Sequence, residues 1–132
     1  VEQLPLQTDS LLITGGEKDV MSLSARSFPA ICFGSETCHI PRSFLEELIQ
    51  QKGIDNIYLL FDMDQEGIKS SKRHIEMLTG LNINRVELPL SGTKSEKDIS
   101  DFFRLGHSSQ ELSRLLIQRR PQITKPVQIK MR

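Results

Sequence analysis

Acidic side chains follow three short apolar runs, and they are the residues best able to do chemistry. The runs end at Thr14, Phe61 and Leu88. The acids that follow them, directly or across a polar loop, are Glu17, Asp19, Asp62, Asp64, Asp98 and Asp101. Carboxylate oxygens are ligands that Mg²⁺ prefers, and such sites keep waters for substrate phosphates. Because a divalent cation offsets the repulsion between like charges, the pattern predicts a site for Mg²⁺ or Mn²⁺.

Asp62 and Asp64 are separated by one residue, so in an extended chain both side chains point to the same side. Such a pair predicts two ligands for one cation. A structural role is also open for Asp64, because an aspartate at this place can cap the helix that follows. The acids after the other two apolar runs favour the metal site over an ordinary turn.

The spacing of apolar residues predicts strands that alternate with helices. Strands are expected over 10–14, 30–33, 57–61 and 84–88, and helices over 17–26, 41–52, 66–78, 98–105 and 109–118. This order predicts an α/β fold in which a parallel sheet lies between helices. Ligand sites of open α/β sheets lie at the carboxyl ends of the strands. We therefore expect the acids to converge at one edge of the sheet.

Two expectations concern the side chains that fill this fold. Tyr58 lies inside an apolar run and is expected in the core. His74 lies among charged residues and is expected at the surface. The apolar set of its helix is Ile68, Ile75, Met77 and Leu78.

The composition is that of an ordinary globular protein. The 132 residues include 17 basic and 17 acidic side chains, so the formal net charge is zero. We therefore do not expect nucleic acid to bind mainly through bulk positive charge. No apolar run could span a membrane, no signal peptide is visible, and Cys32 and Cys38 match no zinc-site spacing. A cytoplasmic protein is expected.

The chain begins with Val1 rather than Met, which predicts a piece of a longer protein. One domain is expected over 1–107. A C-terminal helix and a basic tail or linker are expected over 108–132, because five basic residues and no acidic ones occur from Arg119 onwards.

Three segments resemble a known family. They read LITGGEKDV over 12–20, FDMDQEG over 61–67 and KDISD over 97–101. In order, spacing and strand-helix context they resemble the three motifs of the Toprim domain, most like those of bacterial and phage DNA primases and primase-helicases. The resemblance implies a three-layer, Rossmann-like α/β fold with about four parallel strands flanked by helices.

The resemblance also implies roles for individual residues. Asp62 and Asp64 match the metal ligands of the second motif. Further acidic positions match at Asp19, Asp98 and Asp101, as an outer or second-metal shell. The family has a glutamate, the general acid/base, where this chain has Gly15, so Glu17, two positions later, is the candidate for that role. Lys18 and Lys97 are candidates for contact with phosphate or nucleic acid.

The implied function is Mg²⁺-dependent nucleotidyl transfer in primer synthesis during DNA replication. The implied partners are DNA, nucleotides, and neighbouring zinc-binding or helicase domains of the parent chain. Because Gly15 replaces the glutamate, a catalytically degenerate Toprim module with a structural or DNA- or partner-binding role stays open, as does a Toprim-type nuclease. Asp62 and Asp64 also resemble the first motif of haloacid-dehalogenase-type phosphatases, but Gln65 and Glu66 stand where that family has Gly-Thr.

Overall fold

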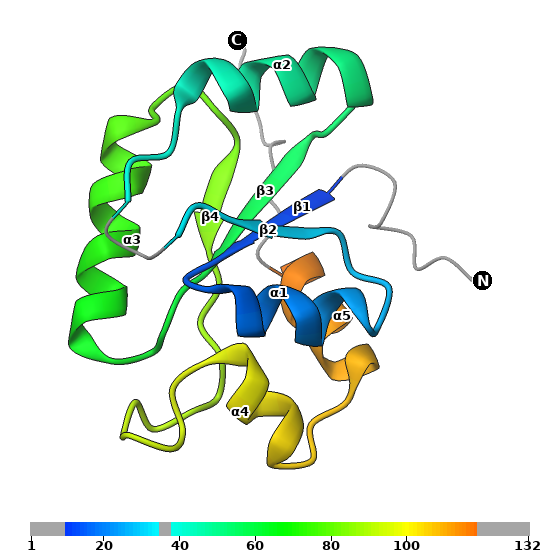
Figure 1. Ribbon diagram of the computed structural model, residues 1–132, viewed down its shortest axis with the longest axis vertical. Coiled ribbons are helices and arrows are strands. Elements are labelled where there is room, and N and C mark those ends of the chain that lie inside the picture. The colour runs from blue at the N-terminus through cyan, green and yellow to red at the C-terminus, as the bar shows by residue number, and fades with distance from the viewer. Residues whose placement is uncertain (1–9, 35–37, 119–132) are drawn as a thin grey trace, which may run out of the picture.

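The computed structural model describes residues 10–34 and 38–118 of the chain. One sheet holds four parallel strands in the order β2-β1-β3-β4 (Figure 1). The elements are β1 (Ser10–Thr14), α1 (Glu17–Ser24), β2 (Ala30–Cys32), α2 (Arg42–Lys52), β3 (Asn56–Leu60), α3 (Gln65–Met77), β4 (Ile83–Arg85), α4 (Ile99–Arg104) and α5 (Ser109–Gln118). The predicted α/β class and parallel pairing are confirmed.

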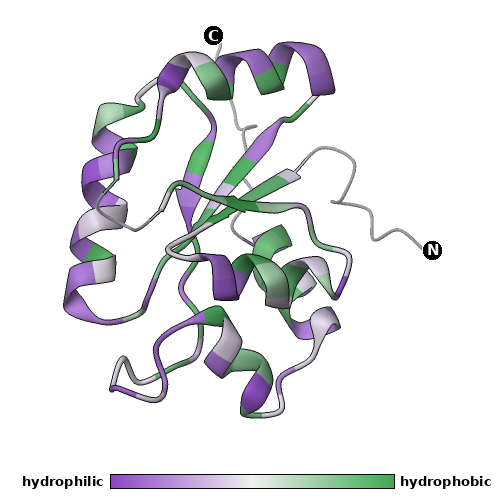
Figure 2. Cartoon of the chain, in the orientation of Figure 1, coloured by the Kyte–Doolittle hydropathy of each residue, from purple (hydrophilic) through white to green (hydrophobic). Residues whose placement is uncertain are grey.

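The side chains of the two central strands alternate between two apolar clusters, because successive residues of a strand point to opposite faces. Leu12 and Tyr58 belong to the cluster under α1, α4 and α5. Ile13 and Leu59 belong to the cluster under α2 and α3. Helices therefore cover both faces of the sheet, and Figure 2 shows hydrophobic residues gathered in the strands. Tyr58 is fully buried, as expected.

The helix α5 belongs to the same core. Its residues Leu112 and Leu116 are fully buried in the cluster that contains Leu12 and Tyr58. The domain boundary at residue 107 stays a prediction, and the basic segment from Arg119 lies outside the described residues.

The strand order creates the place where a site can form. After β1 the chain forms β2, which pairs with one side of β1, and later crosses over to form β3, which pairs with the other side of β1. The strands β1 and β3 are therefore neighbours whose connections to the next strand leave in opposite directions. Thr14 at the end of β1 pairs with Leu60 at the end of β3. Ligand crevices of open α/β sheets lie outside the carboxyl ends of such a strand pair.

The structure corrects one expectation about α3. His74 is buried, with 2% of its surface exposed, and its ring packs edge-on against Phe61. Met77, placed in the apolar set, is 53% exposed. The buried face of the helix carries Gly67, Ser70, Ser71 and His74. Small residues let α3 approach the sheet closely, and such a face has no apolar periodicity for the sequence to reveal.

The fourth strand is also shorter than expected. It ends at Arg85, whereas the apolar pattern predicted a strand over 84–88. Val86 and Leu88 beyond it are nonetheless buried in the core. The Val86 N–H still donates to the carbonyl of Leu59 at 3.0 Å, but the chain beyond it packs on the core without continuing the strand, so hydrophobicity overestimates the length of β4. Within the described ranges, no helix combines the length and the apolar character needed to cross a membrane.

Candidate metal centre

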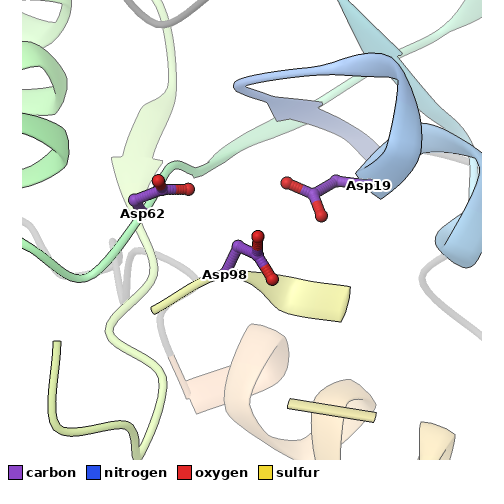
Figure 3. Close-up of side chains that lie close together, drawn as sticks. All are labelled: Asp19, Asp62 and Asp98. Carbon is purple, nitrogen blue, oxygen red and sulfur yellow. The ribbon is translucent and has the colours of Figure 1, made fainter. Parts of the chain in front are cut away.

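Three aspartates from distant parts of the sequence meet at the carboxyl end of the sheet. Asp19, Asp62 and Asp98 each offer a carboxylate oxygen, and these oxygens all lie within 4.8 Å of one another. Figure 3 shows the three carboxylates facing a common space. Asp19 comes from the first turn of α1, Asp62 follows β3, and Asp98 precedes α4. Three of the six acids that were expected to converge therefore meet. We call Asp19, Asp62 and Asp98 the carboxylate triad.

Asp19 is positioned by a tight turn after β1. The Thr14 hydroxyl donates to the carbonyl of Gly16 at 2.9 Å, and Gly16 then caps α1. The helix turns Asp19 inward, so that only 4% of the residue is exposed. Burial raises the pKa of Asp19 to about 6, although a hydrogen bond from the Ser100 hydroxyl opposes the rise. The nearby carboxylate of Asp98 raises the pKa further.

Asp98 is held by the start of α4. Its Oδ1 accepts from the backbone N–H of Asp101 at 2.8 Å. Asp101 reciprocates, because its Oδ2 accepts from the N–H of Lys97 at 3.0 Å and from that of Asp98 at 3.4 Å. This reciprocal pattern is a capping box. Burial raises the pKa of Asp101, but these N–H donors outweigh burial, so the pKa lies below its ordinary value. Asp101 therefore orients Asp98 and stands outside the triad.

Asp62 and Asp64 take different places although they are two residues apart. Asp64 is the N-cap of α3, and its Oδ1 accepts from the N–H of Gly67 at 2.9 Å. Asp62 belongs to the triad and Asp64 does not. Between them, the N–H of Met63 donates to the carbonyl of Lys97 at 2.6 Å, which ties the segment after β3 to the start of α4.

Two lysines lie against these acids. The Lys18 ammonium is 3.1 Å from Asp98 Oδ2, and the Lys97 ammonium is 3.6 Å from both Asp62 Oδ2 and Asp64 Oδ2. The hydrogen bond to Asp98 raises the pKa of Lys18, and the charges of Asp62 and Asp64 raise that of Lys97. Both predicted phosphate contacts therefore lie at the site, paired with carboxylates.

Glu17 lies beside the triad rather than within it. It is exposed at the start of α1. It lines a cleft of about 350 Å³ whose wall is formed by Gly15, Gly16, Glu17, Lys18, Asp19, Asp62 and Asp98. The candidate acid/base thus faces the same open space as the carboxylates.

The structure adds two hydroxyl groups that the sequence did not single out. Ser100 Oγ is 2.7 Å from Asp19 Oδ1 and 3.0 Å from Ser22 Oγ. Serines are common on helix surfaces, so their type carried no signal. The only available hint was that Ser100 lies between the two acids of the segment KDISD.

A protein-family model described as Toprim-like matches residues 12–103, which include all three motifs. The chain belongs to the Toprim-like family. A search of curated proteins finds no match to this Toprim chain.

Solved structures share the Toprim fold. The primase fragment of the bacteriophage T7 primase-helicase superposes with a TM-score of 0.59 at 22% identity, over 82% of this chain and 43% of that one. A chain from bacteriophage T7 lagging-strand DNA polymerase interacting with primase domains of two gp4 subunits, bound to an RNA/DNA hybrid and dTTP, gives 0.61 at 22% identity, over 86% of this chain and 56% of that one. This Toprim chain thus spans about half the length of these neighbours.

Proposed function

We propose that this Toprim domain binds Mg²⁺ or Mn²⁺ through Asp19, Asp62 and Asp98 and serves nucleotidyl transfer in primer synthesis by a DNA primase or primase-helicase. One observation carries the metal site. Three carboxylates from three separate segments place oxygens within 4.8 Å of one another, beside an open cleft. Membership of the Toprim-like family supports the assignment.

The chemistry of the donor set fits a hard divalent cation. Carboxylates this close repel one another, and burial of Asp19 adds a desolvation cost. Lys18 and Lys97 offset the charge of Asp98 and Asp62. Among ion pairs of the described residues, none involves Asp19. The negative charge of Asp19 is therefore not offset by an ion pair among these residues, and a cation in the triad would neutralise it. Mg²⁺ prefers oxygen ligands of this kind.

The metal would supply charge neutralisation and orientation of reacting phosphate oxygens. The residues of this chain would do the rest. Asp98 and Asp62 would exchange their lysine partners for the cation, which would free the ammonium groups of Lys18 and Lys97 beside the triad. Lysine is a compact point charge suited to phosphate. DNA and nucleotides are the proposed partners, beside zinc-binding or helicase domains of the parent chain.

Glu17 is the proposed general acid/base, because it is the glutamate that faces the cleft next to the triad. A second function is favoured by a specific observation. Gly15 stands where the resembled motif has its glutamate, and Glu17 lies outside the triad. A degenerate Toprim module that binds metal and nucleic acid without catalysis would show this arrangement.

The metal site is tested by titrating the chain with Mg²⁺ and Mn²⁺ and following backbone NMR signals. Saturable shifts with Mg²⁺ and broadening with Mn²⁺ are expected around Asp19, Asp62 and Asp98. The variant Asp62→Asn keeps the fold, because Asn fills the same volume, but it is expected to lose site-specific metal binding.

Two further variants sharpen this test. Asp64→Asn is expected to keep the start of α3, because an Asn oxygen accepts the same hydrogen bond from Gly67, and to retain more metal binding than Asp62→Asn, because Asp64 is a cap outside the triad. Asp55→Asn is the control, since Asp55 is exposed beside the opposite end of β3. Unchanged metal affinity in Asp62→Asn, or no saturable shift in the unmodified chain at millimolar metal, would refute the proposed site.

A further inference from the structure

We infer that Ser100, oriented by Ser22, is a positioning residue that aims the carboxylate of Asp19 at the metal. The inference rests on the proposed metal site and concerns a residue that would not touch the cation.

A hydroxyl group carries one proton and accepts others through its lone pairs. The carboxylate of Asp19 can only accept, so the proton of Ser100 is used on Asp19 Oδ1, at 2.7 Å. The 3.0 Å contact between Ser22 Oγ and Ser100 Oγ must then have Ser22 as the donor. The bonds therefore run in one direction, from Ser22 to Ser100 to Asp19.

This chain of bonds fixes the rotation of the Asp19 carboxylate. With Oδ1 held by Ser100, the direction of Oδ2 is determined by the planar geometry of the group. Ser22 lies three residues after Asp19 on the same side of α1, which brings its hydroxyl to Ser100. A buried carboxylate needs such a partner, because an unpaired one would be costly to desolvate.

Ser100 also links two members of the triad. It is two residues after Asp98, in the first turn of α4, while Asp19 is in the first turn of α1. The two residues are 81 positions apart in the sequence. The hydrogen bond between them therefore helps to hold the start of α1 against the start of α4, as does the ion pair of Lys18 with Asp98. Loss of the Ser100 hydroxyl would free both the rotation of Asp19 and its separation from Asp98.

The test measures Mn²⁺ affinity of the whole chain by water-proton relaxation, at a temperature where circular dichroism shows every variant folded. Ser100→Ala is expected to weaken affinity by about 10- to 100-fold, the usual range for residues that orient metal ligands. In a parallel Mg²⁺ titration, the NMR shift changes are expected to persist around Asp62 and Asp98 and to fall around Asp19. General destabilisation would not produce this selective change.

Three matched variants complete the test. Ser100→Thr keeps a hydroxyl and is expected to restore near wild-type affinity. Ser22→Ala is expected to lose less than Ser100→Ala, because Ser100 can still donate to Asp19. Ser113→Ala, in α5, is the control: Ser113 is buried, and its hydroxyl has no hydrogen-bond partner within the part of the chain that the structure describes.

The outcomes separate this inference from the proposed function. If the wild-type chain binds Mn²⁺ at the triad and Ser100→Ala binds it with the same affinity, the positioning role is wrong while the metal site stands. Failure of Ser100→Thr to restore affinity would also overturn it, because the hydroxyl is the group invoked. If the wild-type chain shows no saturable binding, the metal site itself is wrong and the role of Ser100 falls with it.

Discussion

The carboxyl group of Asp19 is charged at neutral pH although only 4% of the residue is exposed. Burial raises its pKa to about 6, well above the value of about 4 that an aspartate has in an unfolded chain. The folded protein thus keeps the proton of Asp19 up to about pH 6, whereas the unfolded chain loses it near pH 4. The stability contributed by this group therefore falls as pH rises through that window. Residues that bind metal commonly lower the stability of the metal-free protein in this way.

We expect Asp19→Asn to stabilise the metal-free domain at pH 7.5, because Asn can still accept the Ser100 hydrogen bond and carries no charge. The gain in free energy of unfolding is of the order of 3 kcal/mol, since the pKa rises by about two units. Urea denaturation in EDTA between pH 4 and 8 measures it. The difference between the two proteins should shrink as pH falls from 6 to 4. A difference that stays constant with pH would show that the buried charge is not its source.

The start of α3 lies unusually close to the chain that follows β3. A Cβ atom on Gly67 would be 2.0 Å from the carbonyl oxygen of Asp62. Only glycine permits this approach, which lets the helix begin beside the triad while Asp64 caps its first turn. The glycine in the segment FDMDQEG therefore has a packing reason. By contrast, Gly16 at the start of α1 has an extended φ of −166° and open space around its Cβ position.

Gly67→Ala is therefore expected to lower the free energy of unfolding by roughly 3 kcal/mol or more, because helix and loop must separate to admit the methyl group. The shift should also displace Asp62 and weaken Mn²⁺ binding. Thermal denaturation and metal titration measure the two effects. Gly16→Ala is the matched control and should change stability little. Equal stability of both variants would mean that the close contact at Gly67 does not constrain the fold.

The whole molecule is neutral, yet the carboxyl edge of its sheet is strongly acidic. Such an edge repels phosphate until a cation is present, so the proposed metal would be the bridge to an anionic substrate. The chain spans 43% of the T7 primase fragment and 56% of the second T7 chain. The remaining surface needed to hold a template and nucleotides is proposed to come from other parts of the parent protein.

In the parent protein, Glu17→Gln is expected to reduce nucleotidyl transfer by about 100-fold or more, as for loss of a general acid/base. Its Mn²⁺ affinity should be unchanged, because Glu17 lies outside the triad. Glu47→Gln, exposed on α2, provides the control. Primer synthesis that survives in Glu17→Gln would show that Glu17 is not the acid/base. A wild-type parent that binds metal but makes no primers would favour the degenerate module.

Local patterns were enough to predict the framework of this protein. Continuous apolar runs indicated the strands, and apolar residues at helical spacing indicated the helices between them. Because parallel strands send their carboxyl ends to one edge, the acids after β1 and β3 and before α4 could be expected to meet. The three motifs were enough to predict the Toprim-like family, since motif order and spacing are properties of the chain itself.

Which acids meet was decided only by the tertiary structure. Asp62 and Asp64 are alike in the sequence, but a hydrogen bond to the Gly67 N–H directs Asp64 to its own helix. Asp98 and Asp101 are alike too, and the capping box separates their roles. The burial of His74 and the bond from Ser100 to Asp19 join segments distant in the sequence. The physical reason is that side-chain direction depends on helix starts and interhelical packing, whereas strand position follows from the periodicity of the chain.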